Sequence, residues 1–110
     1  MTDSPQRKAA NEARFREANE KQQGAAARIL GGGDQLVPFL CECADRSCTS
    51  VVQLTLREYE AVRATPTDGL ATNGHEDPTI EDVVATTERF TQTRKTGAAG
   101  EAFAKLDPRS

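Results

Sequence analysis

Apolar and polar positions follow different patterns along the chain, and the changes between them predict its elements. Residues 5–30 are rich in Ala, Glu, Gln, Lys and Arg, which favour a helix, and Ser4 followed by Pro5 is a typical helix start. One face of this helix carries a thin stripe made of Phe15, Asn19, Gln22, Ala26 and Ile29. So thin a stripe predicts either a mostly solvated helix that packs by one edge or a helix that orders on a partner.

The next segments predict a β-hairpin followed by a short helix. "QLVPFLCEC" (35–43) and "TSVVQL" (49–54) have strand character, "ADRS" (44–47) suits the turn between them, and Pro38 indicates an edge strand. Thr55 and Glu58 have the spacing of a capping box. Residues Leu56, Tyr59 and Val62 recur at helical spacing, so we expect this face to pack on the hairpin, with Tyr59 in the core or at an interface.

The remaining third of the chain predicts a second hairpin and a tail. Residues 69–78 form a loop with at most a short strand, and "TIEDVVA" (79–85) and "RFTQTRK" (89–95) have the residue types of strands. A helix over residues 79–89 also fits the apolar spacing and is the alternative. The sequence thus predicts an α+β fold with these parts: an N-terminal helix (1–30), a Gly-rich joint (31–35), a small zinc-stapled domain (36–95) and a flexible tail (96–110).

Composition limits what so short a chain can stabilise. It has 110 residues with 5% aromatics, so its core is marginal without a staple. The net charge is −3, distributed as +2 in residues 1–30 and −5 in residues 31–95, which disfavours nucleic-acid binding by the folded part. Neither a run of about 20 apolar residues nor a signal peptide is evident, so we expect a cytoplasmic protein whose thiols stay reduced.

All three cysteines lie within "FLCECADRSC" (39–48), with the spacing Cys41-x-Cys43-x4-Cys48. Alternate residues of a strand project to the same side, and the following turn returns the third sulfur, so the three thiols can bind one metal ion. Redox-active thiols and coincidence are the alternatives. A disulfide between Cys41 and Cys43 would be strained, and thiolate-rich tetrahedral sites suit both zinc and iron.

The fourth ligand predicted for this metal is His75 in "NGHED", the only histidine of the chain. Three cysteines and one histidine are an established structural zinc set, here with Asp45 or water as the fallback fourth ligand. Glu76 or Asp77 would then hold the imidazole in one tautomer. Glu42 lies between two ligands, and strand alternation predicts that it faces solvent.

Four sequence blocks resemble a group of small uncharacterised actinobacterial proteins. The blocks are "RFREANE" (14–20), "FLCECADRSC" (39–48), "LTLREYEAVR" (54–63) and "GHE" (74–76), and they span roughly residues 14–95. The group usually has Gly where this chain has Ala44, and an apolar strand where this chain has "DGLATN". The resemblance implies a zinc-bound fold that pairs the cysteines with His75, and it implies no particular activity.

These observations predict a non-enzymatic zinc-binding module that binds a protein partner or larger complex. The docking element would be the N-terminal helix, through Arg14, Phe15, Asn19 and Gln22. The alternatives are an RNA- or ribosome-associated zinc-knuckle protein, in which the basic residues of the helix touch phosphate, and a zinc or thiol redox sensor. The chain lacks the residue order of zinc deaminases, a phosphate-binding loop and a dinucleotide fingerprint, so no enzyme is expected. No membrane contact and no small-molecule substrate are expected either.

Overall fold

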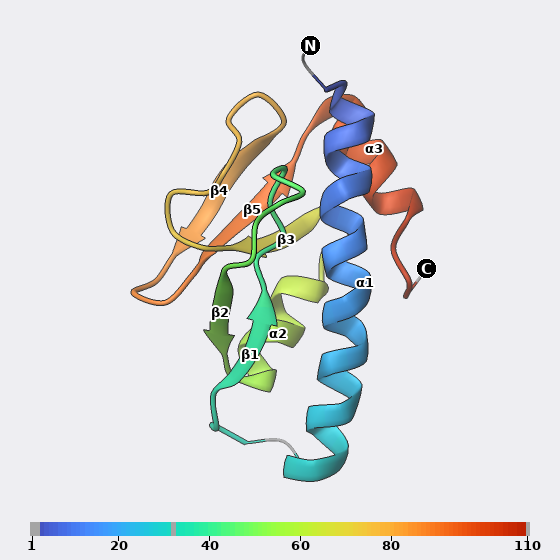
Figure 1. Ribbon diagram of the computed structural model, residues 1–110. Helices are drawn as coiled ribbons and strands as arrows, with labels where there is room; N and C mark the ends of the chain where they lie inside the picture. Colours follow the sequence, from blue (N-terminus) through green and yellow to red (C-terminus); the bar gives the residue numbers. More distant parts are fainter. Residues whose placement is uncertain (1–2, 32, 110) are drawn as a thin grey trace.

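A computed structural model describes residues 3–31 and 33–109 and confirms the α+β fold (Figure 1). A long N-terminal helix runs beside two small antiparallel sheets, and a C-terminal helix packs against it (Figure 1). The elements in chain order are α1 (Pro5–Leu30), β1 (Val37–Leu40), β2 (Val51–Leu54), α2 (Leu56–Arg63), β3 (Asp68–Ala71), β4 (Glu81–Thr86), β5 (Thr91–Lys95) and α3 (Gly97–Lys105).

α1 begins and ends as the sequence predicts, but a different face is buried. The Ser4 hydroxyl accepts a hydrogen bond from the Arg7 backbone N–H, and Gly31, at φ 68°, ends the helix in the left-handed conformation that glycine tolerates. The buried residues are Ala9, Glu12, Ala13, Arg16 and Asn19. Ile29 from the predicted stripe is 82% exposed. Packing against α3 and β1 therefore selects the buried face, and Gly32 of the predicted joint lies outside the described residues.

The first sheet and α2 form the larger apolar cluster. β1 pairs with β2 antiparallel, with Val37 opposite Leu54, and the strand ends at Leu40, before the predicted limit at residue 43. The capping box is present, and the Tyr59 ring stacks on Phe39 with centroids 4.4 Å apart. Tyr59 is therefore a core residue, and Pro38 lies in a strand of a two-stranded sheet, where every strand is an edge.

The second sheet confirms the C-terminal hairpin and excludes the alternative helix over residues 79–89. Its strand order is β3-β5-β4, with both pairs antiparallel and an irregularity between Val83 and Ala85. β3 begins one residue before the segment predicted as a loop with at most a short strand (69–78) and covers its first three residues, and all four residues of β3 are buried. β-branched residues favour a strand over a helix in β4. This edge strand is exposed from Asp82 to Thr86, so the apolar residues at helical spacing are not buried there.

The prediction of a flexible tail is wrong for residues 96–109, and Ser110 lies outside the described residues. Residues 97–105 form α3, whose Ala99 and Phe103 are 1% and 0% exposed and pack with Ala9, Ala13 and Ile80. The segment is rich in alanine and has few large apolar residues, so its sequence did not indicate a buried helix. Its small side chains instead allow close packing against α1. α1 and α3 thus contribute to the core, which is not confined to residues 36–95.

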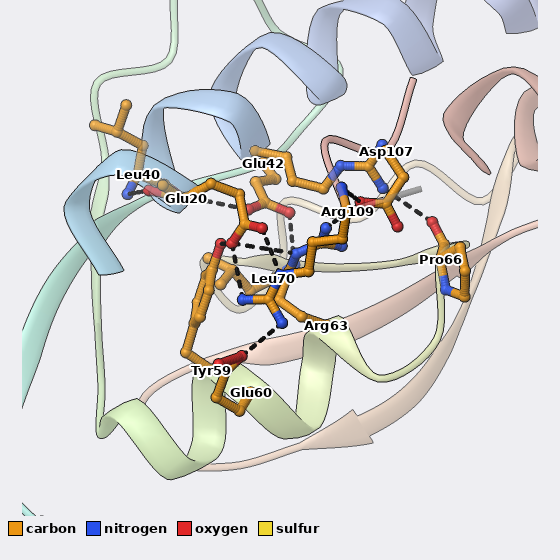
Figure 2. Close-up of polar contacts among 12 residues, drawn as sticks. Glu20, Leu40, Glu42, Tyr59, Glu60, Arg63, Pro66, Leu70, Asp107 and Arg109 are labelled. Atoms are coloured by element: carbon orange, nitrogen blue, oxygen red, sulfur yellow. Dashed lines mark hydrogen bonds and ion pairs between the residues drawn. The ribbon is translucent and has the colours of Figure 1, made fainter. Parts of the chain in front are cut away.

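A buried network of ion pairs ties the C-terminal segment to α1 and α2 (Figure 2). Arg63, whose side chain is fully buried, pairs with Asp107 and lies 3.5 Å from Glu20. Glu20 also accepts a hydrogen bond from the Tyr59 hydroxyl at 2.7 Å and pairs with Arg109. Arg63 and Asp107 are 44 positions apart in the chain, and Glu20 and Arg109 are 89 positions apart. These long-range contacts explain why the segment after α3 is held in place.

A second buried cluster is built around Lys95. Its ammonium lies 2.6 Å from Glu12 Oε1 and 3.1 Å from Glu81 Oε1, and all three side chains are 0% exposed. The ring of Phe103 lies under the ammonium, 4.4 Å from Nζ. One cation therefore faces two carboxyl groups, and burial raises the pKa of Glu12 to about 8 although Lys95 acts to lower it.

Replacing Glu12 by Gln should flatten the pH dependence of stability between pH 4.5 and 8. The folded protein retains a proton on Glu12 up to about pH 8, whereas the unfolded chain loses it near the ordinary value of 4.5. The unfolded state therefore binds fewer protons in this window, and the free energy of unfolding falls as pH rises, by at most about 1.4 kcal/mol per pH unit. Gln does not titrate, so E12Q should lose less stability across the window in urea denaturation at pH 5 to 8.

The matched control is Glu17→Gln on the exposed side of the same helix. E17Q should keep the slope of the unmodified protein. Parallel stability profiles for E12Q and the unmodified protein would contradict a protonated Glu12.

Candidate metal centre

The structure brings Cys41, Cys43, Cys48 and His75 together from three segments. Cys41 and Cys43 follow β1, Cys48 precedes β2, and His75 lies in the loop between β3 and β4. One ligand atom from each residue lies within 4.8 Å of all the others. We call residues 41–48 the knuckle.

The two distances from His75 to the cysteine sulfurs match those of a tetrahedral site. His75 Nδ1 lies 3.6 Å from Cys41 Sγ and 3.7 Å from Cys48 Sγ. Tetrahedral zinc places a sulfur and a nitrogen ligand about 3.6 Å apart, and two sulfurs about 3.8 Å apart. The three cysteines are free thiols, and soft sulfur with imidazole is a donor set for Zn²⁺ or iron. These four side chains can therefore bind one metal ion with little movement.

Backbone hydrogen bonds hold the knuckle in shape. The Asp45 carboxylate accepts from the Ser47 N–H at 2.9 Å and the Ser47 hydroxyl at 2.7 Å, and the Asp45 carbonyl accepts from the Cys48 N–H at 3.0 Å. This turn directs Cys48 back toward Cys41 and Cys43. Asp45 is exposed and is not part of the metal-ligand group, so the structure favours His75 over Asp45 as the fourth ligand.

The loop that carries His75 is a tight turn. Gly74 has φ 91°, which glycine tolerates, and the His75 N–H donates to the Thr72 carbonyl at 2.9 Å. The Thr72 N–H in turn donates to Cys41 Sγ at 3.2 Å, a contact that stabilises a thiolate. Sequence reasoning missed Thr72, because its contribution comes from the backbone and no residue type signals it.

Glu76 and Asp77 do not hold the imidazole in the part of the chain that the structure describes. Asp77 pairs with Lys8 at 2.7 Å and accepts from Thr79, which ties this loop to the start of α1. No hydrogen bond joins the ring of His75 to either carboxylate among these residues. The exposed ring leaves Nε2 available to solvent, consistent with Nδ1 as the ligand atom.

The expectation that Glu42 faces solvent is wrong, because the side chain is 1% exposed. Regular strand pairing ends at Leu40, and the next two backbone N–H groups diverge: Cys41 bonds to Ser50, and Glu42 bonds to Leu70. The Glu42 carboxylate thereby accepts hydrogen bonds from the Asn19 side chain of α1 at 2.7 Å and from the Leu70 N–H at 3.3 Å. Burial raises the pKa of Glu42, although the hydrogen bond from Asn19 opposes the shift.

The thiols differ in how readily they ionise. Burial raises the pKa of Cys41 and that of Cys43. Partial burial acts in the same direction at Cys48, but hydrogen bonds with Ser50, Cys43 and His75 together outweigh it and lower the pKa of Cys48 to about 7. A metal ion binds thiolates, so binding competes with protons at Cys41 and Cys43.

The four residues predicted to contact a partner have different surroundings. Asn19 is 1% exposed, donates to the Leu40 carbonyl at 2.9 Å and accepts from the Leu40 N–H, so it is committed to the fold. Gln22 donates to the Pro38 carbonyl at 3.2 Å. Arg14 is exposed, and Phe15 is partly exposed. Of these four residues, only Arg14 and Phe15 line the pocket beside the knuckle.

Comparison with protein-family models, with curated proteins and with solved structures finds no match, so the family resemblance stays a prediction. Among the described residues, no helix is both long and apolar enough to cross a membrane.

Proposed function

We propose that this chain is a non-catalytic, zinc-binding accessory module that attaches to a larger assembly through the outward face of α1. The observation that carries the proposal is the convergence of three thiols and one imidazole within 4.8 Å. Four protein ligands complete a tetrahedral shell and leave no position for a substrate, which is typical of structural zinc.

The position of the site supports a stapling role. The ligands come from both ends of the loop between β1 and β2 and from the loop after β3, so one ion would join the two sheets. A chain of this size gains little from its apolar core alone, and a metal can supply the missing stability.

The extent of α1 supports attachment. The helix has 26 residues, about 39 Å of length, but its fully buried residues end at Asn19. Its outward face is exposed along the whole length. Because the opposite face packs in the core, α1 would present a rigid surface and would not need to detach from the domain.

Native mass spectrometry should find one zinc ion per chain, with the measured mass separating zinc from iron. Replacing His75 by Ala should weaken zinc affinity at least about a hundredfold in competition with a chelator. Losing a ligand weakens affinity more than losing a neighbouring group that only orients a ligand. Cys48→Ser should weaken it further, since a hydroxyl is a poor zinc ligand.

Asp45→Asn is the matched control. Asn keeps the hydrogen bonds of the turn but removes the carboxylate, so zinc affinity should stay within a few-fold. A large loss in D45N with none in H75A would assign the fourth ligand to Asp45. A metal-free protein under zinc-replete conditions would overturn the proposal.

A further inference from the structure

Four cations recur along the outward side of α1. Arg7, Arg14, Lys21 and Arg28 are seven residues apart, which places them on nearly one side of a helix at intervals of about 10.5 Å. All four are exposed, and within residues 3–31 and 33–109 no acceptor pairs with their side chains. We call them the basic stripe.

The structure divides the basic residues of this helix by role. Lys8 pairs with Asp77 at 2.7 Å, and Arg16 is buried against the Phe103 ring. These two support the fold. The basic stripe makes no such contact, and it lies opposite the buried face of α1.

A pocket of about 370 Å³ opens beside the stripe and is lined by Asn11, Arg14, Phe15 and Arg46. The Asn11 side-chain amide donates to the Cys43 and Ala44 carbonyls, each at 3.3 Å, and so ties the knuckle to α1. Arg46 belongs to the knuckle and Arg14 to the helix. The fold thus holds two guanidinium groups from distant segments at one cavity.

The chemistry of this pocket selects an anion that carries a flat group. Neither Arg14 nor Arg46 has an acidic partner among the described residues, although the chain has more acidic than basic residues. Two like charges at one pocket favour a bound anion, and the planar guanidinium matches phosphate geometry. Phe15 is a partly exposed aromatic wall, which suits stacking of a nucleobase.

We propose that this pocket binds a phosphate and its adjoining base in single-stranded nucleic acid, and that the basic stripe contacts neighbouring phosphates. The inference rests on the proposed function only in taking the outward face of α1 as the contact surface. The net charge of −3 does not oppose it, because residues 1–30, which include the basic stripe, carry a net charge of +2.

Fluorescence anisotropy with labelled oligouridine and oligothymidine of twelve nucleotides tests the proposal on the zinc-loaded full chain. The double variant Arg14→Ala/Arg46→Ala should bind roughly tenfold or more weakly at 50 mM salt. The slope of log K against log salt should fall by about 0.7, since the pocket holds one phosphate and each single-strand phosphate contact contributes about 0.7. Phe15→Leu should weaken binding about fivefold or more while keeping the apolar volume.

Arg57→Ala is the matched control, because Arg57 is 82% exposed on α2 and its ion pair with Asp34 is long, at 3.8 Å. It should bind like the unmodified protein. Stronger binding of oligouridine than oligothymidine would identify RNA as the source of the phosphate, and equal binding would leave single strands of either kind as the ligand.

Three results would overturn the inference: no binding of either oligonucleotide at 50 mM salt, equal loss in R57A and the double variant, or displacement by polyglutamate as effective as by unlabelled oligonucleotide. The last would assign the surface to an acidic polypeptide. Zinc content measured on the same samples separates this failure from that of the proposed function, because a zinc-loaded protein that binds no oligonucleotide contradicts the present inference alone.

Discussion

Treating the purified protein with a strong zinc chelator should lower its melting temperature by roughly 15–30 °C. Structural zinc contributes its binding free energy to folding, and a loss of about 4 kcal/mol shifts the melting temperature of a domain this small by that amount. Residues 41–48 lie outside the regular strands, so no β-ladder joins the knuckle to the loop of His75, and one ion bound by the four ligands would do so. Thermal unfolding followed by circular dichroism measures the shift.

Cys41→Ser provides the internal control for this experiment. The variant should melt near the chelated protein, and the chelator should then have no further effect, because both remove the same ion. If the unmodified, zinc-loaded protein melted at the same temperature with and without chelator, the ion would not be a staple.

Lys95→Met should destabilise the protein by about 3–5 kcal/mol at pH 7. Glu12 is protonated at this pH, so Met, which fills a similar volume, leaves the Glu81 carboxylate without the cation that lies 3.1 Å away. Breaking a buried ion pair from one side costs this much because a charge remains without compensation. Urea denaturation should show the loss as a lower midpoint.

Lys105→Met serves as the control, because Lys105 is exposed and should change stability by less than about 0.5 kcal/mol. Equal effects of K95M and K105M would show that the buried cluster contributes nothing net.

The ligand set of the candidate metal centre follows from sequence because few alternatives exist. All three cysteines lie within eight residues and the chain has one histidine, so any site made of sulfur and imidazole must use these four. The choice between His75 and Asp45 needed the structure, since it depends on the turn at Gly74 and the contact from Thr72 to Cys41.

Glu42 shows where sequence patterns misled. Alternation along a strand places residues 41 and 43 on one side and residue 42 on the other, but it does not say that both sides are covered. Here α1 and β3 both contact the side of Glu42, so its carboxylate is buried with hydrogen bonds from Asn19 and Leu70.

Sequence alone determined the elements whose signals are local. The caps of α1 and α2 depend on residues within a few positions of each other, each hairpin on two neighbouring segments, and the cysteines of the candidate metal centre on eight consecutive residues. Tertiary structure alone decided which polar groups are buried and whether the last segment folds. Lys95 meets Glu12 across 83 positions and Arg16 meets Phe103 across 87, and such long-range pairings leave no periodic trace in the chain. The physical reason is that burial of a charge is favourable only when its partner arrives from another element, and only the folded chain brings the two together.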